Sequence, residues 1–177
     1  MIYVSAAVLA VWGAAVWRTL MFPLGFLLFL VPIPAVILDG IAFPLQLFAA
    51  TFAGVVLDLV GIPALIDGIT IQLPQTVLQV AVACAGLRFL ITTATMGVVI
   101  AYWGQRTLLR RVVVALLAVP IAILANASRV AATGILAYAF GPAAAEGFFH
   151  SFSGSIVFWA GIVVLLGASA LVRRIGR

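Results

Sequence analysis

Long apolar runs, separated by short polar or basic segments, dominate the pattern of the chain. Runs long enough, or nearly long enough, to cross a bilayer cover residues 2–17, 20–38, 78–103, 112–140 and 148–172, judged against the roughly 20 residues that a transmembrane helix needs. The pattern predicts an all-α fold, a polytopic transmembrane helix bundle of about five spans. We expect residues 1–177 to form a single integral membrane domain.

Two segments between the second and third runs have a different character. Residues 42–60 place Thr51, Gly54 and Asp58 at helical spacing as a weakly polar stripe, which is typical of an interfacial or re-entrant helix. The alternative is an ordinary membrane span, because charge bias sets topology only loosely. Residues 61–77 arrange prolines and glycines around a short Ile-Thr-Ile alternation, and they predict a short hairpin-like loop.

Composition excludes a soluble protein. Hydrophobic residues make up 67% of the chain and charged residues only 7%, and the mean hydropathy is +1.38. No soluble domain of this size buries so much apolar surface. The net charge of +5 would suggest nucleic acid in a soluble protein. Here most of the basic residues flank apolar runs, so we expect them to orient the chain in the lipid bilayer, and we expect no nucleic-acid partner.

The basic residues also predict the topology. Those at the boundaries of the runs are Arg18, Arg106, Arg110, Arg111, Arg173, Arg174 and Arg177. Their clusters should be cytoplasmic, because basic residues are enriched on that side of a membrane. Residues 61–77 and 141–147, which contain Asp67 and Glu146, then face the extracytoplasmic side. The first run has its positive charge after it, which favours an uncleaved span with the amino terminus outside.

Three chemically capable groups lie inside predicted spans, and a fourth lies at the start of one. They are Cys84, Arg88, Arg129 and His150. Placing an arginine inside a bilayer costs free energy unless its side chain faces the interior of the helix bundle and binds partners there. An arginine within a predicted span therefore indicates a functional site. Arg129 shares a helical face with Asn126, three residues earlier, and Arg88 follows Cys84 by one turn.

The predicted topology places three of these groups at similar depth. Cys84, Arg129 and His150 fall in the outer half of the bilayer, within roughly 15 Å of one another along the normal. Each has a simpler explanation taken singly: a lone cysteine is usually a small hydrophobe, a boundary histidine is often interfacial, and an arginine can join packed helices. Their coincidence on three helices indicates a site with a thiol, an imidazole and a guanidinium.

The residues alone leave two classes of function open. One is an intramembrane enzyme with a cysteine nucleophile, either a protease that uses water or a transferase. The other is a small membrane transporter or binding protein that holds an anionic solute with Arg129 and His150. Only the thiol of Cys84 distinguishes the two classes, because a binding site for an anionic solute does not need a thiol. With one cysteine and one histidine, we expect no metal site, and no phosphate loop or dinucleotide fingerprint indicates a cofactor.

Five blocks of the sequence carry a likeness to a known family, and the last three are specific. They are FPLGFLLFLVPIP (22–34), FPLQLFAATFA (43–53), ACAGLRFL (83–90), LANASRVAATGILAYAFG (124–141) and GFFHSFSGSIVF (147–158). In this order they resemble the exosortase/archaeosortase family of membrane cysteine transpeptidases. Val82 and Ala85 depart from it, because the family often has glutamate and serine there, so any role of an acidic neighbour of the cysteine is in doubt.

The resemblance implies a catalytic core over residues 78–172 with Cys84, Arg129 and His150 as the catalytic residues. Arg88 and Asn126 are secondary candidates. The activity it implies is cleavage of carboxy-terminal, PEP-CTERM-like sorting signals, made of a short motif, a transmembrane helix and a basic tail. The implied partners are proteins bearing that signal and an unknown acceptor molecule. The implied location is the cell (inner) membrane, with a multi-pass chain and the site toward the extracytoplasmic side.

Overall fold

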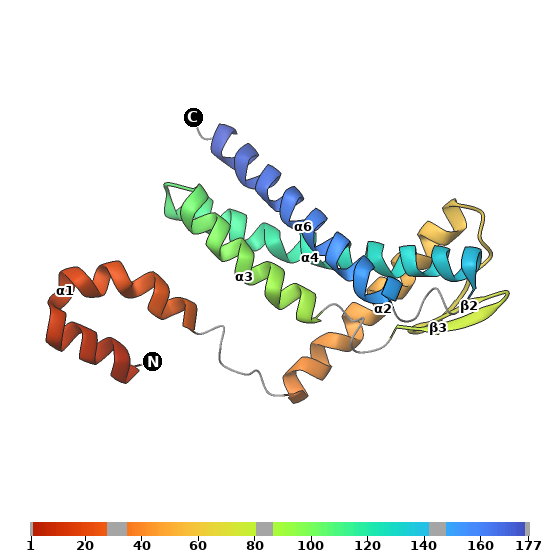
Figure 1. Ribbon diagram of the computed structural model, residues 1–177, viewed down its shortest axis with the longest axis horizontal. Coiled ribbons are helices and arrows are strands. Elements are labelled where there is room, and N and C mark those ends of the chain that lie inside the picture. Colours follow the sequence, from red (N-terminus) through yellow and green to blue (C-terminus); the bar gives the residue numbers. More distant parts are fainter. Residues whose placement is uncertain (1, 28–34, 81–86, 142–147, 176–177) are drawn as a thin grey trace. The chain divides into compact units, whose positions relative to one another are not determined.

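The computed structural model describes residues 2–27, 35–80, 87–141 and 148–175 (Figure 1). The chain divides into two compact units, residues 1–37 and 38–177. Within the described residues, four helices are long and apolar enough to cross a membrane, and a shorter apolar helix covers Phe89–Gly104. The prediction of an all-α, polytopic membrane fold is confirmed.

The first unit contains helix α1 (Ile2–Phe26), which is interrupted at Gly13. Gly13 has φ 77° and ψ 175°, a conformation that glycine adopts far more easily than other residues. The predicted boundary between runs 2–17 and 20–38 differs from the structure, because α1 continues to Phe26. Arg18 and Thr19 do not stop the helix: arginine favours helices, and the Thr19 hydroxyl donates to the carbonyl of Ala15 at 3.3 Å.

Helix α2 (Ala35–Leu59) covers the segment for which an interfacial or re-entrant helix was expected. Its part from Gly40 to Leu59 has the length and apolarity of a membrane-crossing helix, which favours the alternative of an ordinary span. The polar stripe has a packing explanation. The Thr51 hydroxyl donates to the Leu47 carbonyl of its own helix at 2.9 Å, and a Cβ on Gly54 would come within 2.6 Å of the Ile66 side chain.

A three-stranded antiparallel sheet follows α2, so the predicted hairpin-like loop is confirmed and has one more strand than a hairpin. The strands are β1 (Leu65–Asp67), β2 (Thr70–Leu73) and β3 (Thr76–Gln79), in the order β1-β2-β3. Ile71 of β2 lies opposite Ile66 and Leu78, and it is 1% exposed. The inward face of the sheet thus adds to a core shared with α2 and α4, which includes Ala50, Ala53, Leu57, Leu73, Val80, Ala131 and Ala137.

Strand β3 also corrects the start of the third predicted span. The apolar run from residue 78 was interpreted as one helix, but Thr76–Gln79 is a strand and helix α3 (Leu87–Gly104) begins later. A short stretch at the edge of an apolar run can form either a strand or the start of a helix, and the local pattern does not distinguish the two. The depth estimated for Cys84, which assumed a helix from residue 78, therefore loses its basis.

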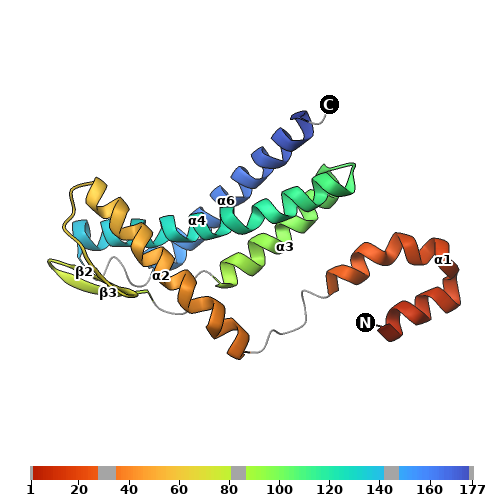
Figure 2. The same ribbon diagram turned by 180° about the vertical axis from the view of Figure 1, so that it is seen from behind.

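Helices α3, α4 (Leu108–Phe140) and α6 (Phe148–Ile175) pack together through small residues (Figure 2). A Cβ on Gly97 of α3 would lie 2.5 Å from the Cβ of Ala118 in α4 and 3.7 Å from Leu165 Cδ2 in α6. Such small residues allow helix backbones in membranes to approach closely. The fully buried Val114 and Leu165 fill the space between them.

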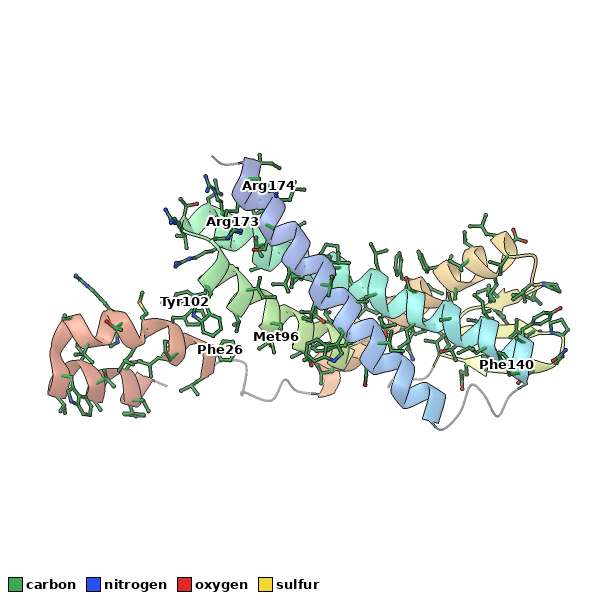
Figure 3. The ribbon with its side chains drawn as sticks, turned by 45° about the horizontal axis from the view of Figure 1, so that its top comes forward. Phe26, Met96, Tyr102, Phe140, Arg173 and Arg174 are labelled. Carbon is green, nitrogen blue, oxygen red and sulfur yellow. The ribbon has the colours of Figure 1, made fainter. Side chains whose placement is uncertain are left out.

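One end of this bundle, which we call the arginine end, comprises residues 105–111 and 173–174. The Nε of Arg111 donates to the carbonyl of Gln105 at 3.0 Å, and the guanidinium lies over the Tyr102 ring, 4.6 Å from its centroid. The side-chain amide of Gln105 in turn donates to the carbonyl of Ser169 at 2.7 Å. Figure 3 shows Arg173 and Arg174 at this end and Phe140 at the opposite one.

Candidate functional site

Helix α4 carries two of the predicted site residues inside the bundle. Asn126 is 4% exposed and Arg129, three residues later, is half-buried. They share a face because residues three apart are neighbours on a helix. Ser128 is exposed instead, and its hydroxyl donates to the Leu124 carbonyl of the same helix at 2.9 Å. The Thr133 hydroxyl donates to the Arg129 carbonyl at 2.9 Å.

The guanidinium of Arg129 lies against helix α6 at Gly154. An ideal Cβ on Gly154 would be 3.4 Å from Cζ of Arg129, 3.5 Å from Nη2 and 3.6 Å from Nε. The guanidinium therefore lies beside the α6 backbone at this position, at a distance that leaves space for one methyl group in ordinary van der Waals contact. A side chain larger than alanine at this position would have to compete with the guanidinium for space.

His150 is the third residue of α6, as the sequence predicted for a residue near the start of that span. Its imidazole lies outside the described part of the structure. Position 150 precedes Gly154 by four residues, so the two positions lie one turn apart on the same helix face. The backbone of α6 thus brings position 150 to within a turn of the residue that contacts Arg129.

Cys84 lies outside the described residues, and Arg88 is the second residue of α3 with its side chain likewise outside the description. The first turn of α3 is fixed against α6. The Phe89 ring meets the Phe158 ring edge to face, with centroids 5.9 Å apart and an interplanar angle of 89°. A Cβ on Gly161 would lie 3.7 Å from Phe89 Cζ and 3.8 Å from the Cβ of Ala125. All three helices therefore meet at the level of Gly161.

The packing register relates the start of α3 to Arg129. Gly97 is level with Ala118, and Phe89 with Ala125, so moving toward the amino terminus of α3 corresponds to moving toward the carboxyl terminus of α4. Leu87 is the first residue of α3 and precedes Phe89 by two residues. By the same register, Leu87 lies within one helical turn of the level of Arg129 along the bundle. Cys84 precedes Leu87 by three residues in the sequence.

Sequence reasoning missed two residues that shape this region. Gly154 was not singled out, although a second glycine stands seven residues later at Gly161 and small residues at such spacing often line helix contacts. Gln46 was also passed over, although an amide in so apolar a helix needs a partner. Its Nε2 donates to the carbonyl of Val80 at 2.7 Å.

No metal centre is assigned, because the described residues bring no three histidine, cysteine, aspartate or glutamate side chains together. Among the candidate residues whose side chains the structure describes, Arg129 is the one that carries a charge. A fixed cation in an apolar bundle can stabilise an anion far better than one in water, because the surroundings do not screen it.

A family model described as transmembrane exosortase matches residues 1–167. The chain belongs to this family. No curated protein and no solved structure matches the exosortase chain. The matched range includes the positions of Cys84, Arg129 and His150, and it confirms the family that the sequence blocks indicated.

Proposed function

We propose that this exosortase is a membrane cysteine transpeptidase. It cleaves the carboxy-terminal sorting signal of exported proteins at the extracytoplasmic face of the cell (inner) membrane and transfers the new carboxyl end to an acceptor. The observation that carries the proposal is the half-buried Arg129 guanidinium, held against Gly154 one turn from position 150 and level with the start of α3. Membership of the family supports the class of activity.

In the proposed reaction the Cys84 thiolate attacks the carbonyl carbon of the scissile peptide bond. The carbonyl oxygen becomes an oxyanion as the C–S bond forms. Collapse of this intermediate breaks the C–N bond, and His150 supplies the proton that the leaving amine needs. An acceptor amine, or water if no amine is present, then attacks the thioester; the new C–N or C–O bond forms, the C–S bond breaks, His150 takes the proton that the nucleophile loses, and Cys84 is released as the thiolate.

Arg129 has the electrostatic part in this scheme. Its charge stabilises the thiolate before attack and the oxyanion afterwards, from a position fixed by α6. Loss of one such donor typically slows an acyl-transfer enzyme by about 100- to 1,000-fold. Arg88 and Asn126 are the secondary candidates: Arg88 begins α3 and Asn126 lies on the Arg129 face of α4.

The arginine end supports the proposed orientation. Its five arginines in the described residues are Arg106, Arg110, Arg111, Arg173 and Arg174. Basic residues of this kind favour the cytoplasmic side, so the sheet at residues 65–79 faces outward. Substrates that leave the cell through the membrane would then meet the enzyme on the side where their folded parts emerge.

The test uses the single thiol of the chain. Cys84→Ala should abolish cleavage of a reporter with a sorting signal while protein level and membrane insertion stay unchanged, because alanine is well tolerated in apolar segments. Mass spectrometry of the wild-type product distinguishes transfer to an amine from hydrolysis. A reporter still trimmed by the Cys84→Ala protein would exclude the covalent mechanism. A wild-type protein that takes up an anionic solute without cleaving any reporter would favour the transporter alternative.

A further inference from the structure

The side chain of Gln46 joins helix α2 to the end of the sheet at a buried position. Gln46 is 4% exposed and Val80 is 3% exposed. The Gln46 Nε2 donates to the Val80 carbonyl at 2.7 Å, across 34 residues of sequence. Burying an amide in an apolar helix costs free energy unless the amide is hydrogen-bonded. The bond to the Val80 carbonyl offsets that cost for Gln46.

Both backbone polar groups of Val80 are engaged. Its N–H donates to the carbonyl of Ile69 at 2.9 Å, and its carbonyl accepts from Gln46. The N–H bond continues the pairing of β3 with β2, whereas the carbonyl bond reaches a different element, α2. Val80 is thus fixed from two directions at the point where the sheet ends.

The chain passes from Val80 to Cys84 in four residues and enters α3 at Leu87. At that end, Phe89 is held by Phe158 of α6. The described residues on both sides of the segment that carries the thiol are therefore anchored, and at Val80 the side-chain amide of Gln46 supplies one of the two hydrogen bonds.

We propose that Gln46 is a positioning residue for the nucleophile: its bond to Val80 sets where the chain bearing Cys84 leaves the sheet. The inference rests on the proposed function. The described hydrogen bond of Gln46 is with the Val80 carbonyl, and Gln46 acts through that backbone group. A catalytic group displaced by about 1 Å can lose about 100-fold in rate, so loss of the bond should lower kcat and leave KM for the sorting signal unchanged.

Gln105 offers a matched control. It is also a buried glutamine, 2% exposed, and its Nε2 also donates to a backbone carbonyl at 2.7 Å, that of Ser169. It lies at the arginine end, away from Arg129 and Val80. Gln46→Met and Gln105→Met remove the same kind of donor and keep a side chain of similar length.

The experiment compares the two variants in the full-length protein in proteoliposomes, by processing kinetics, thermal unfolding and the rate of Cys84 alkylation with a small maleimide. We expect Gln46→Met to lower kcat by about 100-fold and to change the alkylation rate. Gln105→Met should lower the melting temperature similarly and leave both rates unchanged. Gln46→Glu, whose neutral carboxyl can still donate to the carbonyl, should recover part of kcat and provides the test if Gln46→Met fails to fold.

Equal kinetic losses in Gln46→Met and Gln105→Met would overturn the proposal, because Gln46 would then act through stability alone. Unchanged kcat and alkylation in a folded Gln46 variant would overturn it too. Failure of the proposed function gives a different result: the wild-type protein would cleave no sorting signal. The alkylation rate would still report whether Gln46 positions the thiol.

Discussion

Enlarging residue 154 tests whether the Arg129 guanidinium acts from its position against α6. An alanine Cβ would lie 3.4 Å from Cζ of Arg129, an ordinary contact, so Gly154→Ala should process sorting signals at nearly the wild-type rate. Valine adds two methyl groups about 1.5 Å beyond Cβ, and its rotamers in a helix are restricted. One methyl would then come within roughly 2 Å of the guanidinium, which must move by about 1.5 Å to regain a normal contact.

A displacement of that size predicts a loss of about 100-fold or more in kcat for Gly154→Val. The assay is cleavage of a sorting-signal substrate in proteoliposomes, normalised to the amount of folded protein. Gly167→Val is the matched control, because a Cβ on Gly167 of the same helix meets nothing within 4 Å. Processing at the wild-type rate by Gly154→Val, or equal slowing by Gly167→Val, would refute the reasoning about Arg129.

Two further predictions concern topology and packing. In a Cys84→Ala background, a cysteine at the exposed Asp67 should react with an impermeant maleimide added to intact cells, and one at the exposed Arg106 should not; the reverse pattern would place the sheet on the cytoplasmic side. Gly97→Ala should lower the free energy of unfolding by about 1–3 kcal/mol, because its Cβ would lie 2.5 Å from that of Ala118. The second change Ala118→Gly should restore the loss in thermal unfolding experiments, and a Gly97→Ala protein as stable as wild type would contradict the close approach of α3 and α4.

The helices were predictable wherever the apolar run was long and bounded by charge. The run at 112–140 became α4, and the run at 148–172 became α6, because each is long and apolar and arginines stand at one end of each. Runs 2–17 and 20–38 were divided in the wrong place, because one arginine does not end a helix, whereas a glycine backbone at Gly13 interrupts one. The run from residue 78 failed at its start, because Leu78 and Gln79 belong to strand β3, which is defined by its pairing with β2 and not by a local pattern.

The catalytic residues of the candidate site stay a prediction, and the structure describes the surroundings of one of them, Arg129. Arg129 was identified from the cost of a cation in an apolar helix, and it is half-buried in the bundle. Its contact with Gly154 could not be derived, because the relative rotation of α4 and α6 depends on packing across the whole interface. The Gln46–Val80 bond joins residues 34 apart, and nothing in the local sequence reports such a pairing. The roles of Cys84 and His150 stay predictions.

The length of α4 sets the depth at which Arg129 can act. Its 33 residues measure about 50 Å, whereas the hydrocarbon core of a bilayer is about 30 Å thick and is crossed by about 20 residues. A crossing that starts after Arg110 and Arg111 is complete within about one turn of Arg129, and the turns beyond it carry Ala137, which packs in the core that includes the sheet. Such a crossing places Arg129 near the level where hydrocarbon gives way to water, which under the proposed function is the level at which a lipid-embedded substrate helix would end and a dissolved acceptor would begin.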